Sequence, residues 1–230
     1  MVDHWFFTRH DNPYIYIPNL IGYLRIASSL VAFAVALWSP TACVLLYTFG
    51  FICDELDGRF ARMFGQTTML GQVLDMVTDR LSTAGLLVVL SILNQQWYFC
   101  FLVLLMLDIF SHWFQMYATL AAGAATHKDT ESQSPVVRFY YQQRLFMGFC
   151  CICCEVLYLS LYLLHFPQFH RWPPAVVVAA LAVPGFALKQ FINCVQLWTA
   201  MQQLVATDRH KLTQAGNSAK VKLEALSKTQ

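Results

Sequence analysis

Long apolar stretches, each of a length that can cross a membrane, constrain this sequence more than any other feature. Hydrophobic residues make up 57% of the 230 positions, and charged residues make up only 12%. A membrane-spanning helix needs about 20 mainly apolar residues. Composition and stretch length together predict an all-α polytopic membrane protein.

Six spans are predicted, separated by polar turns and loops. Their approximate limits are 20–38, 41–63, 69–93, 97–122, 144–164 and 175–205. We expect an N-terminal interfacial segment over 1–19 and a six-helix membrane domain over 20–205. The remainder, 206–230, is expected to be a polar, flexible tail.

The distribution of Lys and Arg predicts that both termini lie in the cytosol, because cytosolic connections carry an excess of positive charge. Arg59 and Arg62 lie between the second and third spans, and Lys128 and Arg138 lie between the fourth and fifth. The C-terminal tail is also basic. The opposite connections carry almost no positive charge, with Arg171 as the exception.

Four carboxylates stand out between Asp54 and Asp79. Asp54 and Asp57 are three residues apart, and Asp75 and Asp79 are four apart, so each pair shares one face of a helix. Two such faces in contact would place four carboxylates around one small space. These groups cannot all stay ionised in an apolar setting without positive charge, and oxygen ligands favour a hard cation such as Mg²⁺ or Mn²⁺.

The complete pattern from Asp54 to Asp79 reads DxxDGxxAR, eight residues, GxxxD and xxxD. It resembles the motif of the CDP-alcohol phosphotransferase family, and every fixed position of that motif is present. The resemblance implies an enzyme that transfers a phosphate-linked group from a CDP-linked donor to an alcohol and releases CMP. The purely structural alternative is an acidic cluster that only pairs with Arg59 and Arg62.

The resemblance also implies roles for the four aspartates. Asp54, Asp57 and Asp75 are expected to bind metal ions, two per site. Asp79 is expected to act as the catalytic base that takes the proton of the attacking hydroxyl, and also to contact a metal. These two roles compete because metal ligation lowers basicity, and the sequence leaves both open.

Three further motif residues are candidates for binding the nucleotide donor. Gly58 leaves its helix face open to the nucleotide, although small residues also permit close helix packing. Arg62 can pair with phosphate oxygens. Thr68 can bond to the donor, and its alternative role is to cap the third predicted helix.

Other stretches resemble the eukaryotic phosphatidylinositol synthases, a branch of the same family. Among them are Pro18–Arg25, Leu74–Arg80 and Tyr162–Phe166. This resemblance implies CDP-diacylglycerol and myo-inositol as substrates and a location in the endoplasmic reticulum membrane with the site facing the cytosol. Family members are often homodimers, so a homodimer is also expected.

The motif itself does not select the acceptor, so residues elsewhere must do so. Arg138 and Arg144 are candidates for positioning inositol or the donor phosphate, or they are ordinary positive-inside residues. Asp108 and His112 are four apart, so they pair with each other or line the acceptor pocket. Glu155 is a carboxylate within a span and is expected to face the interior of the bundle.

The sequence leaves two classes of alternative function open. The same chemistry could use serine or glycerol 3-phosphate as the acceptor. A divalent-cation transporter could use the four acidic groups, although a transporter more naturally holds them near the membrane midplane. No nucleic-acid partner is expected, since a net charge of +2 provides no large basic surface.

Overall fold

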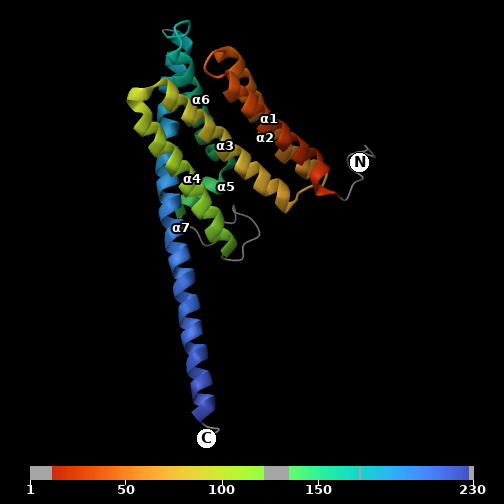
Figure 1. The fold of residues 1–230 in the computed structure, drawn as a ribbon, viewed down its shortest axis with the longest axis vertical. Coiled ribbons are helices and arrows are strands. Elements are labelled where there is room, and N and C mark those ends of the chain that lie inside the picture. Colours follow the sequence, from red (N-terminus) through yellow and green to blue (C-terminus); the bar gives the residue numbers. More distant parts are fainter. Residues whose placement is uncertain (1–11, 122–134, 171, 228–230) are drawn as a thin grey trace. The chain divides into compact units, whose positions relative to one another are not determined.

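A computed structural model describes residues 12–121, 135–170 and 172–227. All the regular secondary structure in these ranges is helical, which confirms the all-α prediction. Most of the predicted interfacial segment and Lys128 lie outside the described residues. The elements, shown in Figure 1, are η2 (Pro13–Ile15), α1 (Ile17–Val35), α2 (Pro40–Met63), α3 (Met69–Leu93), η3 (Gln95–Trp97), α4 (Tyr98–Ala121), α5 (Pro135–Gln142), α6 (Arg144–His165) and α7 (Pro173–Ser227).

Five of the described helical segments are long and apolar enough to cross a membrane, which agrees with a polytopic membrane protein. They comprise α1, α3, η3 with α4, α6, and α7. Helix α2 has sufficient length but carries the charged half of the motif in its C-terminal part. The count of six spans and the cytosolic termini therefore stay predictions.

Helix α1 starts at Ile17, and Pro18 lies in its first turn, where a proline costs no backbone hydrogen bond. The structure differs from the predicted elements at two places. The short helix α5 lies inside the predicted loop. Helix α7 continues to Ser227, well past the predicted end of the sixth span at 205. Strong helix formers such as Gln, Lys, Leu and Ala extend the helix past the end of the apolar stretch.

The chain forms two compact units, which are described separately. The first comprises Met1–Leu105 and Cys153–Val183, and the second comprises Met106–Ile152 and Pro184–Gln230. The four motif aspartates all belong to the first unit, so the candidate site is contained within it.

In the first unit, α1 packs against α2 and α3 (Figure 1). Hydroxyl groups connect these helices. Ser28 Oγ donates to the carbonyl oxygen of Leu46 (2.7 Å), and the Oγ atoms of Ser29 and Ser82 lie 3.0 Å apart. Such bonds hold helices together in lipid, where the hydrophobic effect does not favour their association.

A tight turn between α2 and α3 brings the two halves of the motif onto consecutive helices. Gly65 has φ +65°, a left-handed conformation that favours glycine. Thr68 then caps α3, since its Oγ1 accepts a hydrogen bond from the backbone N of Gly71 at 3.0 Å.

In the second unit, polar side chains connect α4 with α7. Gln196 Nε2 donates to the carbonyl oxygen of Ser111 (3.1 Å), and Gln203 Nε2 donates to that of Ala118 (3.5 Å). Both contacts have the same sequence offset, so the two helices run parallel and in register here. The buried Lys189 on α7 donates to Asn193 and lies 5.1 Å from the ring centre of Tyr140 on α5.

Candidate metal centre

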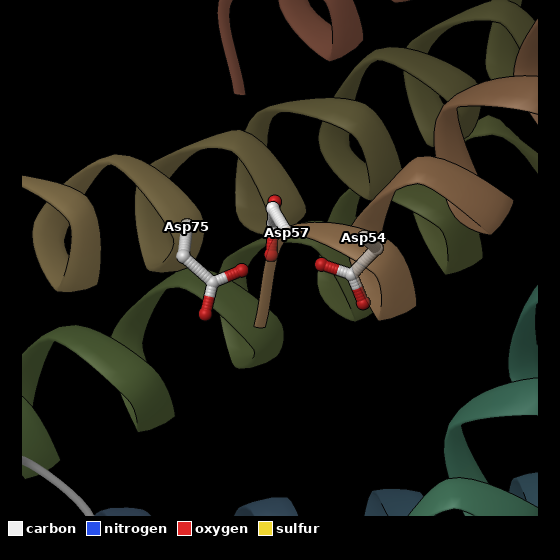
Figure 2. Close-up of side chains that lie close together, drawn as sticks. All are labelled: Asp54, Asp57 and Asp75. Atoms are coloured by element: carbon white, nitrogen blue, oxygen red, sulfur yellow. The ribbon is translucent and has the colours of Figure 1, made fainter. Parts of the chain in front are cut away.

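Three motif carboxylates meet at one point. Asp54 and Asp57 project from α2 and Asp75 projects from α3, as Figure 2 shows. One ligand atom from each lies within 4.8 Å of the other two. Three oxygen donors at this spacing, from two helices, suit a single hard divalent cation. The predicted convergence of the two acidic helix faces is thus present in the structure.

A guanidinium from a third helix lies among these carboxylates. Arg25 on α1 is only 3% exposed. Its Nη1 contacts Asp57 Oδ2 at 2.8 Å and Asp75 Oδ1 at 3.2 Å. Its Nη2 contacts Asp54 Oδ1 at 2.6 Å and also contacts Asp79 Oδ1. One arginine therefore contacts all four aspartates of the motif.

The charges and the accessibility of the cluster fit a divalent cation. One guanidinium shared by four carboxylates leaves an excess of negative charge. The side chains of Asp54, Asp75 and Asp79 are 32%, 34% and 33% exposed, so an ion can reach them from outside. Asp57 is the buried member, with 10% of its side chain exposed. Excess negative charge and oxygen-only donors are what a hard cation requires.

Asp79 lies beside the three-residue group rather than within it. Its Oδ1 contacts Arg25, and its Oδ2 lies 3.8 Å from Nη2 of Arg80. The group that can share one ion consists of Asp54, Asp57 and Asp75. This arrangement leaves Asp79 available for a role other than ligation, and its role as base or ligand stays a prediction.

The candidate donor-binding residues Gly58, Arg62 and Thr68 lie between Asp57 and Asp75 along the chain. A side chain added at Gly58 would lie 3.5 Å from Nη1 of Arg62, so the guanidinium of Arg62 lies near the open face of Gly58. Arg62 itself is exposed. Thr68 has the capping role described above, and its hydroxyl hydrogen remains available to a ligand. Binding of the donor by these three residues stays a prediction.

The structural alternative predicted that the aspartates pair with Arg59 and Arg62, and this prediction was wrong. Arg59 pairs with Glu55 on the exposed side of α2, with 2.7 Å between Nε and Oε1. The guanidinium that contacts the aspartates is Arg25. The sequence contained a signal for this residue, because Arg25 is the one charged residue in the first predicted span. A charged side chain within a span is a functional candidate by default.

Glu155 on α6 faces the interior of the first unit, as predicted. Its Oε2 accepts a hydrogen bond from the hydroxyl of Tyr47 on α2 (2.6 Å), and its Oε1 accepts one from Thr83 on α3 (2.8 Å). Thr83 lies one helical turn from Asp79, and Tyr47 lies two turns from Asp54. Glu155 therefore joins the two helices that carry the carboxylates.

We expect Glu155→Ala to destabilise the protein, because it leaves two buried hydroxyl donors without their acceptor. An unsatisfied buried donor costs about 1–3 kcal/mol. Thermal unfolding in detergent measures the effect. Glu55→Ala is the matched control, since it removes only an exposed ion pair, and such pairs contribute about 0–1 kcal/mol. Equal stability of the two variants would contradict this bridging role.

The remaining predicted acceptor residues lie in the second unit. Asp108 and His112 pair with each other on α4, with 3.6 Å between Oδ1 and Nδ1, which agrees with the structural alternative. Arg138 lies on α5 and is exposed. Arg144 begins α6, and its side chain is outside the described part.

Comparisons with known proteins agree with the chemistry of this site. The family model described as CDP-alcohol phosphatidyltransferase matches residues 15–207. No solved structure matches the chain.

Curated relatives cover most of the chain. A protein of Arabidopsis thaliana named CDP-diacylglycerol–inositol 3-phosphatidyltransferase 1 is 45% identical over 210 residues, covering 86% of this chain and 92% of its own. The Saccharomyces cerevisiae protein named CDP-diacylglycerol–inositol 3-phosphatidyltransferase is 41% identical, covering 84% and 87%. A Homo sapiens protein with the same name is 34% identical, covering 86% and 95%.

Proposed function

Because the chain belongs to the CDP-alcohol phosphatidyltransferase family, we propose that it transfers the phosphatidyl group of CDP-diacylglycerol to myo-inositol, giving phosphatidylinositol and CMP. The names of relatives that align over most of their own length support this substrate pair. The observation that carries the proposal is the convergence of Asp54, Asp57 and Asp75 on one point, since the reaction must neutralise a pyrophosphate.

The proposed transfer exchanges one bond at phosphorus for another. A hydroxyl oxygen of inositol forms a bond to the phosphorus that carries the diacylglycerol. The bond from that phosphorus to the bridging oxygen breaks, and CMP leaves with the electron pair. The carboxylate of Asp79 accepts the hydroxyl proton as general base, which strengthens the attacking oxygen.

The metal ligands and the donor-binding residues have separate tasks in this proposal. Asp54, Asp57, Asp75 and Asp79 are the candidate ligands for Mg²⁺ or Mn²⁺. Divalent cations at such a site supply positive charge to the phosphate oxygens. On the protein side, Arg62 pairs with a donor phosphate and Thr68 donates its hydroxyl hydrogen to the donor. Gly58 leaves room for the nucleotide.

The membrane setting suits one substrate dissolved in lipid and one in water. CDP-diacylglycerol enters from the bilayer, and inositol comes from the aqueous side. We place the enzyme in the endoplasmic reticulum membrane as a homodimer, with six spans, cytosolic termini and a cytosolic active site. The relatives' eukaryotic sources support the location in the endoplasmic reticulum, and the positive charge near the motif supports a cytosolic active site.

Release of CMP by the purified protein tests the proposed function. The protein is supplied with CDP-diacylglycerol and Mg²⁺ or Mn²⁺, and myo-inositol, serine and glycerol 3-phosphate are tested in parallel. We expect release that depends on inositol and stops when the metal is chelated. Release only with another alcohol would keep the family chemistry and overturn the acceptor. Failure to bind the donor, with no release for any alcohol, would favour a cation transporter.

A further inference from the structure

Arg25 occupies an unusual position for a charged residue in a helix that spans a membrane. It lies on α1, while all of its carboxylate partners lie on α2 and α3. Its side chain is almost fully buried. A buried guanidinium is costly unless it is paired and hydrogen-bonded, and Arg25 meets this requirement through the four aspartates.

The shape of the guanidinium explains how one side chain contacts four others. Its planar group presents donors in a fixed fork, whereas a lysine ammonium is a compact point charge. Nη1 contacts one carboxylate on each of α2 and α3, and Nη2 does the same with the other two. Each terminal nitrogen thus connects the same pair of helices. Without this cation, four like charges would repel one another across the helix interface.

Arg25 contacts the same carboxylates that a metal ion would bind. The three carboxylates that can share one ion, Asp54, Asp57 and Asp75, are all engaged by the guanidinium. A divalent cation bound to them would lie within a few ångströms of a fixed positive charge. Coulomb repulsion at such a distance is large in a partly buried site.

We propose that Arg25 is an internal counter-cation of the metal site, which holds the four aspartates together before metal binds and competes with the metal for them. This inference rests on the proposed function, because it assumes that the carboxylates bind a divalent cation. Arg25 thereby acts as a positioning residue. It reduces the affinity of the site for metal and makes the metal-free protein stable.

Direct binding of Mn²⁺ to Arg25→Gln, in the absence of substrates, tests the competition. Electron paramagnetic resonance of free Mn²⁺ gives the dissociation constant. We expect Arg25→Gln to bind Mn²⁺ at least about tenfold more tightly than the wild type, since it loses a neighbouring positive charge. Arg59→Gln is the matched control, because it removes the same charge from an exposed ion pair. The side chains of this pair, Arg59 and Glu55, are 67% and 69% exposed. Its affinity should equal that of the wild type.

Thermal unfolding of the same proteins tests the positioning role. Metal-free Arg25→Gln should unfold at a lower temperature than the wild type, and Mn²⁺ should raise its Tm by more. Arg25→Lys keeps the charge without the fork, so we expect wild-type Mn²⁺ affinity with a lowered metal-free Tm. Unchanged or weaker Mn²⁺ binding by Arg25→Gln would overturn the competition. An unchanged metal-free Tm would overturn the counter-cation role.

A double-mutant cycle keeps the proposal testable where Arg25→Gln does not fold without metal. Asp79→Asn removes one of the four repelling charges, so Arg25→Gln should lower the metal-free Tm less in that background. Failure of Asp79→Asn to rescue folding, or equal effects in both backgrounds, would overturn the inference. Absence of Mn²⁺ binding by the wild type would instead contradict the metal site of the proposed function.

Discussion

Asp57→Asn is expected to abolish CMP release while the protein stays folded. Asp57 is the buried member of the group that can share one cation, so its charge is the one least screened by water. Metal ions contribute several kcal/mol of transition-state stabilisation to phosphoryl transfer. Each 1.4 kcal/mol corresponds to about a tenfold change in rate, so kcat/KM should fall by at least about a thousandfold.

The fold should survive because asparagine has nearly the same shape as aspartate. Its amide oxygen can still accept the hydrogen bond that Nη1 of Arg25 donates. Size-exclusion profiles and thermal unfolding in detergent check this point. Glu55→Gln is the control on the same helix, since Glu55 is exposed and pairs with Arg59. Activity of Asp57→Asn close to that of Glu55→Gln would refute the metal assignment.

The sequence predicted the long helices well because a membrane imposes a simple rule on them. Stretches of about 20 apolar residues mark where helices cross lipid, and α3, α4 and α6 begin and end within a few residues of the predicted limits. The same rule does not describe short helices or helices made of polar residues. Hydropathy therefore missed the eight-residue α5 and the polar continuation of α7 to Ser227.

The aspartate cluster was predictable because it depends on helical periodicity and one tight turn. Asp54 and Asp57 share a face of α2, and the short connection with Gly65 returns the chain as α3 with Asp75. The part played by Arg25 was not predictable in this way. It depends on how α1 packs against both helices, with contacts that are 29 to 54 residues apart in sequence, and no local pattern encodes such packing.

The two roles predicted for Asp79, catalytic base and metal ligand, compete with each other. A catalytic base must be ionised yet able to accept a proton, whereas a metal ligand has its basicity lowered. Asp79 contacts two cationic side chains, Arg25 and Arg80, and lies outside the group of three that can share one ion. Its position beside that group, rather than within it, favours the base role.

Asp79→Asn should therefore separate turnover from donor binding. An amide cannot accept the hydroxyl proton, and a general base contributes about 10²- to 10⁴-fold, so kcat should fall within that range. The dissociation constant of CDP-diacylglycerol, measured with Mn²⁺ present and inositol absent, should change by no more than about threefold, since the other three carboxylates remain. Asp57→Asn, measured alongside, should lose both properties. If Asp79→Asn lost donor binding as fully as turnover, Asp79 would act mainly as a metal ligand, and the proton would have to pass to another group.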